Sequence, residues 1–166
     1  MVIARPDQVW CADMTYILLR RGFLYLVAIM DRATRRVLSW LSNSMDVEFC
    51  IKAREDAMRL HGRPGTFDTD RGSQFTGPRF TDVLLEAEAQ ISMGGRGRRM
   101  DNVMIERLWR SLQYECVYPD AFETGSEARA GSGKWIAFCN TARPHSALGG
   151  RTPLEAHEGP GLTAAA

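Results

Sequence analysis

The continuous apolar segment Phe23–Met30 constrains the fold more than any other part of the sequence. Such a run suits a central strand that is buried on both faces of its sheet. It is the longest apolar run in the chain, and it is far shorter than the roughly 20 residues that a membrane-spanning helix needs. The segment therefore predicts a covered sheet and no membrane span.

Two further strands are predicted beside this segment, at Val9–Ile17 and Val37–Leu41. Short turns separate them from it, so the three strands should form an antiparallel meander. The remaining elements are predicted as a helix at 47–60, a strand at 66–69, a helix from 76 to about 89, a strand at 91–93, and helices at 101–114 and 127–141. Gly131 and Gly133 are expected to weaken the last helix. This order indicates an α/β chain with a mixed sheet.

The 166 residues suffice for one domain with a core of its own. The first residues contain no signal-peptide apolar region, so we expect the chain in the cytosol. The cysteines are scattered and form no CxxC pair, which predicts buried free thiols and no zinc site. They are Cys11, Cys50, Cys116 and Cys139.

The net charge of +1 argues, taken alone, weakly against a DNA-binding protein. The distribution of charge is more informative, since only Lys52 and Lys134 of the 21 basic residues are lysine. Arginine suits phosphate binding, but a GC-rich genome explains the same bias equally well. The basic cluster consists of Arg96, Arg98 and Arg99, followed by Arg107 and Arg110.

Carboxylates are the candidates for chemistry, because phosphodiester chemistry with two Mg²⁺ ions needs a few of them in one cleft. Asp13 lies within an apolar strand, where a buried unpaired acid is costly; the alternative is a polar position that faces solvent. Asp70 follows the strand at 66–69, and ligands favour the carboxyl ends of strands in such sheets. A turn aspartate before Gly72 is the alternative, and Asp68 competes for the same role.

Glu106 belongs to a predicted amphipathic helix. The apolar face of this helix consists of Ile105, Leu108, Trp109 and Leu112. Glu106 falls on the flank of that face, where a helix packed on a sheet edge would offer a carboxylate to a cleft. The alternative is a surface pair with Arg110, four residues further on.

Four motifs in order resemble those of a known family. They are Trp10-x-x-Asp13-x-Thr15-Tyr16, Asp70-x-Gly72-Ser73-Gln74-Phe75, Asp101-Asn102-x-x-x-Glu106-x-x-Trp109-x-x-Leu112 and Asn140-Thr141-x-Arg143-Pro144-His145-Ser146-Ala147-Leu148-Gly149. Thirty-five residues separate Asp70 from Glu106. The chain resembles insertion-sequence transposases with a retroviral-integrase-like core and a DDE triad, over nearly its whole length.

The resemblance implies an RNase H-like fold, a five-stranded mixed sheet flanked by helices, with the catalytic core at residues 1–150 and a C-terminal tail at 151–166. It implies that Asp13, Asp70 and Glu106 hold two Mg²⁺ (or Mn²⁺) ions in a polynucleotidyl transferase. That enzyme would cleave DNA at the element's ends with water and then join the freed 3′-OH to target DNA, without a covalent protein–DNA intermediate. A homo-oligomer on DNA, in the bacterial cytoplasm, is implied as well.

Further residues are candidates for DNA contacts. Arg96, Arg98, Arg99 and Arg110 are the basic ones. Asn102 either approaches DNA or caps the helix, for which Asp101 competes. His145 either touches DNA or makes a turn-stabilising hydrogen bond. For the tryptophans Trp10, Trp40 and Trp109, core packing is expected.

The sequence departs from the family pattern in two places. Family members carry a helical DNA-recognition region before the catalytic core, and none is recognisable before Trp10. Gly94 stands where close relatives are expected to have an acid, which affects the local loop. Two alternatives therefore stay open: a catalytically silent, truncated remnant that acts as a DNA-binding or dimerising module, and an RNase H-like nuclease that only hydrolyses. Strand-transfer products would distinguish the nuclease from a transposase.

Overall fold

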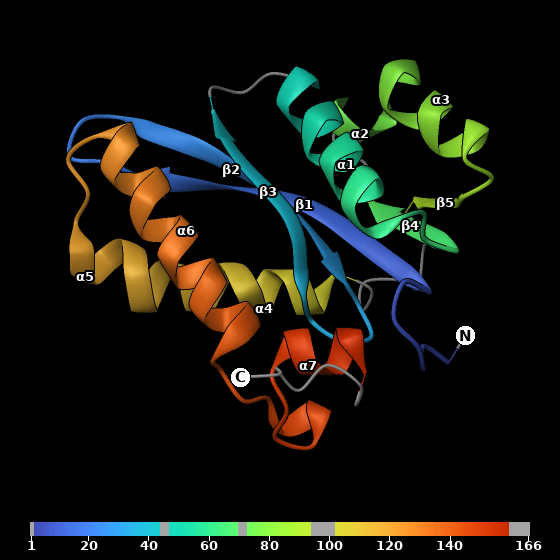
Figure 1. Cartoon of the computed structure of the whole chain (residues 1–166). Coiled ribbons are helices and arrows are strands. Elements are labelled where there is room, and N and C mark those ends of the chain that lie inside the picture. The colour runs from blue at the N-terminus through green and yellow to red at the C-terminus, as the bar shows by residue number, and fades with distance from the viewer. Residues whose placement is uncertain (1, 44–46, 70–72, 94–101, 160–166) are drawn as a thin grey trace.

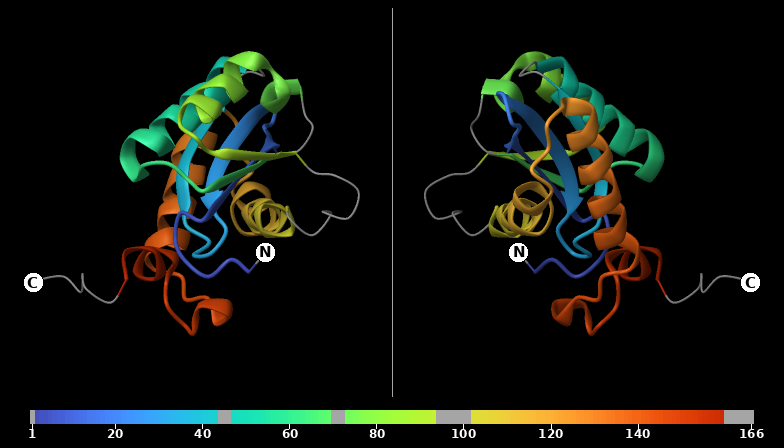
Figure 2. Two further views of the ribbon diagram at one scale, coloured as in Figure 1. Left: turned by 90° about the vertical axis from the view of Figure 1, so that its right-hand side faces the viewer. Right: turned by 90° about the vertical axis from the view of Figure 1, so that its left-hand side faces the viewer.

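The structure is a computed structural model that describes residues 2–43, 47–69, 73–93 and 102–159. A mixed sheet runs through its middle and helices cover both faces (Figure 1, Figure 2). Its strands are β1 (Val9–Leu18), β2 (Phe23–Asp31), β3 (Val37–Asn43), β4 (Thr66–Thr69) and β5 (Gln90–Met93). Their spatial order is β3-β2-β1-β4-β5, which confirms the predicted five-stranded mixed sheet.

The pairing of the strands divides the sheet at β1. On one side β1, β2 and β3 pair antiparallel, as the predicted meander requires. On the other side β1 pairs parallel with β4, and β4 pairs parallel with β5. The predicted strand limits differ from the observed ones by two residues at most.

The helices follow the predicted order, with more segments than predicted. They are α1 (Val47–His61), α2 (Ser73–Thr76), α3 (Pro78–Glu86), α4 (Val103–Leu112), the π-helical η1 (Gln113–Val117), α5 (Tyr118–Asp120), α6 (Gly125–Thr141), the 3-10 turn η2 (Ser146–Leu148) and α7 (Pro153–Glu158). The helix predicted from 76 to about 89 begins at Pro78, since the fixed φ of proline suits a first helical position. The helix predicted at 101–114 ends as α4 at Leu112 and continues as the π-helical segment.

The two faces of the sheet bury different sets of side chains, because side chains alternate along each strand. Cys11 and Met30 point toward α4 and α6, whereas Trp10 and Ile29 point toward α1 and α3. The predicted core tryptophans are buried or packed against the core. All four cysteines are buried and free, as predicted, and burial raises the pKa of the Cys11 thiol to about 12.

Helix α6 was expected to be weakened by Gly131 and Gly133, and the structure gives another reason for the presence of these glycines. The helix is continuous from Gly125 to Thr141, and the Thr124 side chain caps it by accepting a hydrogen bond from the backbone N–H of Glu127. A Cβ atom at Gly131 would lie 2.4 Å from the Phe122 ring. The absence of a Cβ therefore lets α6 approach its neighbours closely. The same holds for Gly133, where a Cβ atom would lie 3.0 Å from the Trp40 ring.

The segment predicted as a C-terminal tail contains helix α7, which contacts α6. His157 of α7 lies 3.2 Å from Asp7 at the other end of the chain, measured from Nε2 to Oδ1. The boundary after residue 150 stays a prediction. Within the described ranges, no helix is both long enough and apolar enough to cross a membrane.

We predict that Gly131→Ala lowers the free energy of unfolding by at least about 1 kcal/mol. Alanine favours a helix by about 1 kcal/mol over glycine, but overpacking against Phe122 costs about 1–3 kcal/mol and a contact of 2.4 Å lies at the severe end. Urea denaturation measures the change. Gly125→Ala is the matched control, since its nearest neighbour would lie 3.9 Å away. A stabilised Gly131→Ala variant would show that helix propensity decides at this position.

Candidate active site

Asp13 occupies the middle of β1, on the face of the sheet that α4 covers. Its side chain is partly buried, and its Oδ2 accepts a hydrogen bond of 3.0 Å from the indole Nε1 of Trp109. Trp109 itself is 7% exposed and belongs to the core under the sheet. Trp109 therefore has two roles: it packs in the core as predicted, and it fixes the orientation of the Asp13 carboxylate.

Glu106 lies on α4, three residues before Trp109. Side chains three residues apart on a helix are neighbours, with Cβ atoms about 5–6 Å apart. Because the indole of Trp109 reaches Asp13, Glu106 is on the same flank of α4 as the strand carboxylate. Its side chain is exposed, and no ion pair joins it to Arg110, so the alternative of a surface pair is not realised. The structure thus joins Asp13 to the helix that carries Glu106.

Asp70 lies outside the described residues. The residue before it, Thr69, is the last residue of β4 and pairs with Ala12 in the register of β1 and β4. The end of β4 therefore lies beside Ala12, the residue that precedes Asp13 in β1. The competing candidate, Asp68, is 6% exposed and pairs with Arg32 at 2.6 Å between Oδ2 and Nη1. This ion pair gives Asp68 a structural partner.

The other predicted site residues are divided between described and undescribed parts of the chain. Arg96, Arg98 and Arg99 lie outside the described residues. Asn102 occupies the N-cap position of α4 in a helical conformation, and its side chain makes no capping hydrogen bond. Arg110 is exposed on α4.

His145 makes the predicted turn-stabilising bonds through its backbone. Its N–H donates to the carbonyl of Arg151, and its carbonyl accepts from the N–H groups of Leu148 and Gly150. The imidazole is half-buried and lines a hollow away from Asp13. The turn role is therefore carried by the main chain, and the side chain remains available for another contact.

No three His, Cys, Asp or Glu side chains gather around a potential metal position in the part of the chain that the structure describes. Asp70 is not in that part, so the predicted set of three is represented only by Asp13 and Glu106. Both offer carboxylate oxygens, which are the ligands that Mg²⁺ prefers.

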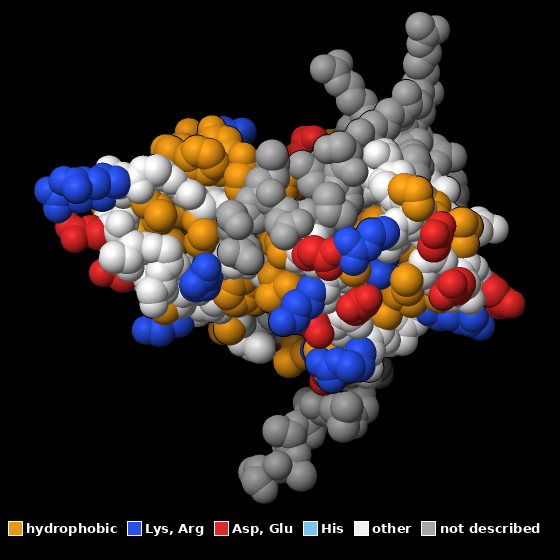
Figure 3. Space-filling view, turned by 90° about the horizontal axis from the view of Figure 1, so that it is seen from above, with side chains coloured by type: hydrophobic (Ala, Val, Ile, Leu, Met, Phe, Trp, Pro, Cys, Tyr) orange, Lys and Arg blue, Asp and Glu red, His pale blue; other side chains and the backbone are white. Residues whose placement is uncertain are grey.

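Figure 3 views the molecule from above and shows acidic and basic side chains interleaved over the described part of this face. This agrees with the small net charge of the sequence. A polyanion such as DNA would therefore be attracted by local clusters of basic residues and not by a positive potential over the whole surface.

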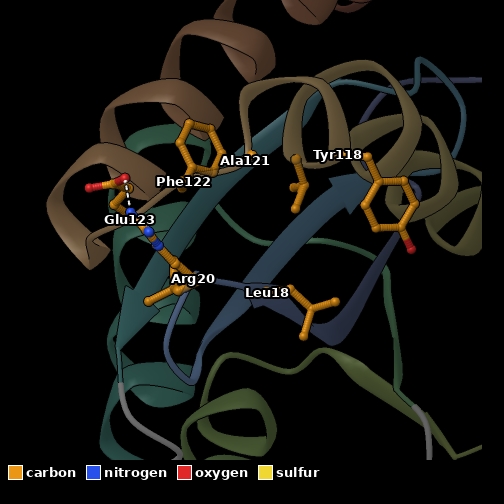
Figure 4. Close-up of a pocket in the computed structure, with 8 residues that line it drawn as sticks. Leu18, Arg20, Tyr118, Ala121, Phe122 and Glu123 are labelled. Atoms are coloured by element: carbon orange, nitrogen blue, oxygen red, sulfur yellow. Dashed lines mark hydrogen bonds and ion pairs between the residues drawn. The ribbon is translucent and has the colours of Figure 1, made fainter.

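A hollow of about 480 Å³ lies between the β1–β2 turn and α5 (Figure 4). Its walls include Leu18, Tyr118 and Phe122, and an ion pair of 2.8 Å joins Arg20 to Glu123 beside it. Leu18 is five residues along β1 from Asp13, which corresponds to about 17 Å. This hollow is therefore not part of the carboxylate site.

Comparison with known proteins identifies the family. A family model described as integrase core domain matches residues 3–99, which is more than half of the chain, and a second model with the same description matches residues 87–153. The chain belongs to the integrase core domain family. Its predicted membership is thereby confirmed.

The curated relatives of this integrase core are bacterial transposases. The transposase for insertion sequence element IS904 of Lactococcus lactis is 34% identical over 154 residues, which are 90% of this chain and 61% of the relative. The transposase for IS629 of Shigella sonnei is 31% identical over 95% of this chain and 54% of its own length. The chain therefore spans a little more than half the length of these relatives.

Solved structures share the fold of this integrase core. A chain of the simian T-cell lymphotropic virus intasome matches with a TM-score of 0.78 and 16% identity, over 96% of this chain and 57% of its own. The HTLV-2 integrase catalytic core domain, solved in complex with magnesium, matches with a TM-score of 0.67 and 20% identity, over 93% of this chain and 98% of its own. The predicted RNase H-like fold is confirmed.

The bond from Trp109 to Asp13 and the Arg32–Asp68 pair were missed by sequence reasoning. For the hydrogen bond from Trp109 to Asp13, the one signal in the sequence is that Trp109 lies three residues after Glu106 on the same predicted helix. Nothing in the sequence marks Arg32 as the partner of Asp68, because the two residues lie 36 positions apart.

We predict that Asp68→Asn lowers the free energy of unfolding by about 1–3 kcal/mol, because it removes the negative charge that pairs with the partly buried Arg32 guanidinium. The matched control is Glu123→Gln, which breaks the exposed pair with Arg20 and should change stability by at most about 1 kcal/mol. Urea denaturation of both variants measures the difference. Equal, small effects would mean that Asp68 is not a structural residue and would return it to the list of candidate ligands.

Proposed function

We propose that this chain is the catalytic core of an insertion-sequence transposase, which cleaves DNA and transfers the strand to a target in the bacterial cytoplasm. One observation carries the proposal: the Trp109 side chain, one helical turn from Glu106, donates its hydrogen bond to Asp13. A strand carboxylate and a helix carboxylate therefore share one flank of α4. Asp70 follows β4 directly in the sequence, and Thr69 pairs beside Asp13's neighbour Ala12.

Asp13, Asp70 and Glu106 would hold divalent metal, Mg²⁺ or Mn²⁺. The donor set fits, because all three are carboxylates and hard cations of this kind take oxygen ligands. When bound, two such ions would supply an activated water and charge neutralisation at the leaving oxygen. The solved HTLV-2 core contains magnesium and has the same fold, which supports the choice of metal class.

The protein's own contribution is to hold the carboxylates in place. Trp109 fixes Asp13 by a charge-assisted hydrogen bond, which is stronger than a neutral one. The Arg32–Asp68 pair fixes β4 two residues before Asp70. Helix α4 rests on the core through Ile105 and Leu112, so the position of Glu106 is set by packing. Such preorganisation lets charge form on the phosphate without rearrangement of the site.

DNA and further copies of the chain are the proposed partners. The relatives are named as transposases of insertion sequences, and the solved neighbours include an intasome and a dimeric core. The proposed DNA contacts are those predicted from sequence: Arg96, Arg98, Arg99, Asn102, Arg110 and His145. Selection of the element's ends is assigned to a separate recognition region, as in the family.

We predict that Asp70→Asn and Glu106→Gln each reduce Mg²⁺-dependent DNA cleavage and strand transfer by more than about a hundredfold. Loss of an outer-sphere partner of a metal ligand already costs roughly 10–100-fold, so loss of a ligand should cost more. The matched control is Asp82→Asn, an exposed acid on α3, which should retain wild-type rates. Both activities are measured on DNA that carries the element's ends.

The products separate the alternatives. Cleavage without joined products would identify a nuclease that only hydrolyses. Absence of both activities in the wild type, together with a melting temperature that Mn²⁺ does not raise, would identify a silent remnant. Wild-type rates in Asp70→Asn would refute the proposed triad.

We predict that Trp109→Phe raises the metal concentration for half-maximal cleavage by about 10–100-fold, because Asp13 loses the donor that orients it. Its matched control is Trp10→Phe, which removes the bond from Trp10 to Asp7 at the end of the chain. Both variants lose one indole donor in the core, so both should lose some stability. Only Trp109→Phe should change the metal requirement; equal metal requirements would mean that Trp109 has a packing role alone.

A further inference from the structure

A second hollow, of about 270 Å³, lies where α4, α6 and α7 meet in the lower part of Figure 1. Its wall comes from the β2–β3 turn, from α4, from α6 and from the segment around η2. The basic side chains that line it are Arg35, Arg107, Arg143 and His145. Basic groups from three separate parts of the chain therefore converge on one cavity, which we name the basic pocket.

The basic pocket holds more positive than negative charge. Arg143 pairs with Glu115 at 2.6 Å between Nη2 and Oε1. Among the residues that the structure describes, no carboxylate lies within ion-pairing distance of Arg35 or Arg107. The Asp31 carboxylate near Arg35 already accepts three hydrogen bonds from other groups. An anion in the pocket would therefore meet two guanidinium groups that lack a counter-charge.

The electrostatics of the pocket reflect this crowding of like charge. Burial lowers the pKa of Arg35, and the charges of Arg32 and Arg107 lower it further. Burial also lowers the pKa of His145, and the charges of Arg143 and Arg35 act in the same direction. An anion would relieve this repulsion, because opposite charge at close range favours the charged forms.

Two arginines of the pocket, Arg35 and Arg143, are held by hydrogen bonds before any ligand binds. Arg35 has a φ of 64°, a left-handed conformation that costs free energy in a residue other than glycine, and its Nη1 donates to the carbonyl of Arg32 at 2.8 Å. Arg143 is oriented by Glu115. Fixed donors lose less conformational entropy when a ligand binds than mobile surface arginines do.

The C-terminal sequence motif builds one wall of the pocket. Asn140 joins the end of α6 to β3, since its amide donates to the carbonyl of Val37 and accepts from the N–H of Val37, both at 2.9 Å. Gly149 and Gly150 have φ values of 66° and 82°, which let the chain turn back so that His145 bonds with Arg151. The proposed metal site uses no residue of this motif, whereas the basic pocket contains both of its basic residues, Arg143 and His145.

The basic pocket is separate from the carboxylate site. The α4 residues that line it are Met104, Arg107, Leu108 and Ser111, which have the spacing of one helical face. At 100° per residue, Glu106 stands about 160° around the helix from Met104 and from Leu108. The two sites are therefore on opposite flanks of a helix whose diameter is about 10–12 Å with side chains.

We propose that the basic pocket binds a phosphate group of the DNA backbone, at a second contact away from the cleaved bond. This inference rests on the proposed function for the source of the phosphate. Guanidinium groups suit the ligand, because their forked donors match pairs of phosphate oxygens. Apolar side chains in the wall, among them Leu108 and Trp135, lower the local dielectric constant and so strengthen these contacts.

The first test uses inorganic phosphate as the probe, with the full 166-residue chain free of divalent metal. We expect phosphate to shift the imidazole NMR resonances of His145 in a saturable manner. Arg107→Gln should raise the half-saturating concentration at least fivefold, since it removes a cation that has no structural partner among the described residues. Arg59→Gln, an exposed helical arginine on the opposite face of the sheet, should match the wild type. Absence of a His145 response, an unchanged Arg107→Gln variant, or an equal response to acetate would overturn the phosphate site.

The second test assigns the source of the phosphate. Fluorescence anisotropy of a labelled DNA duplex, again without divalent metal, gives the slope of log affinity against log salt concentration. Arg107→Gln should reduce the magnitude of that slope by about one, whereas Arg59→Gln should leave it unchanged. A phosphate response combined with an unchanged DNA slope would overturn DNA as the source and leave a free phosphate ligand.

Failure of the proposed function gives a different pattern. Glu106→Gln should lose cleavage and keep the contribution of Arg107 to the salt slope, because the two side chains point about 100° apart on α4 and Glu106 does not line the basic pocket. A wild type that lacks cleavage but shows the Arg107-dependent slope would refute the catalytic proposal and support the pocket. If Glu106→Gln also loses the contribution of Arg107 to the salt slope, the basic pocket is not independent of the catalytic site, and the proposal of a separate phosphate site is overturned.

Discussion

Strand β1 joins the two halves of the sheet, since it pairs antiparallel with β2 on one side and parallel with β4 on the other. Parallel neighbours need a crossover connection, and α1 provides it between β3 and β4. That crossover brings the carboxyl end of β4 beside the middle of β1, where Asp13 stands. An acid in mid-strand would be costly in a covered sheet without a partner, and the indole of Trp109 supplies one. The place of Asp13 thus depends on the sheet topology and on α4 together.

Close packing and buried charge fix the elements around β1. Helix α6 approaches its neighbours at Gly131, where a side chain would collide with Phe122. The Arg32–Asp68 pair ties the β2–β3 turn to β4 in a place where each charge alone would be expensive to bury. Such contacts contribute to a unique arrangement more than to net stability, because replacing a buried pair by apolar residues is often neutral. We infer that their value lies in holding the end of β4 and the face of α4 in register.

The sequence allowed the strand order along the chain, the α/β class and the likeness to integrases to be predicted, because apolar periodicity and motif order are local properties. Contacts between distant segments could not be predicted in this way. The pairing of Asp68 with Arg32 is one such contact, and the choice of Asp70 over Asp68 as the ligand stays a prediction. Gly131 was interpreted through helix propensity, whereas its role comes from tertiary packing. The roles of Asp70 and of the arginines at 96–99 still rest on sequence alone.

Helix α4 serves two sites from different flanks, with its apolar face between them against the core. One flank bears Glu106 and Arg110, and the other bears Arg107, which lines the basic pocket together with Arg143. Successive residues of a helix point about 100° apart, so adjacent positions 106 and 107 can serve separate sites without sharing a surface. A polyanion bound at the Arg107 flank can approach the Glu106 flank only where bound cations neutralise the negative charge of the carboxylates. One rigid helix can therefore fix the distance between a reacting phosphate and an anchoring one, which flexible surface arginines could not do.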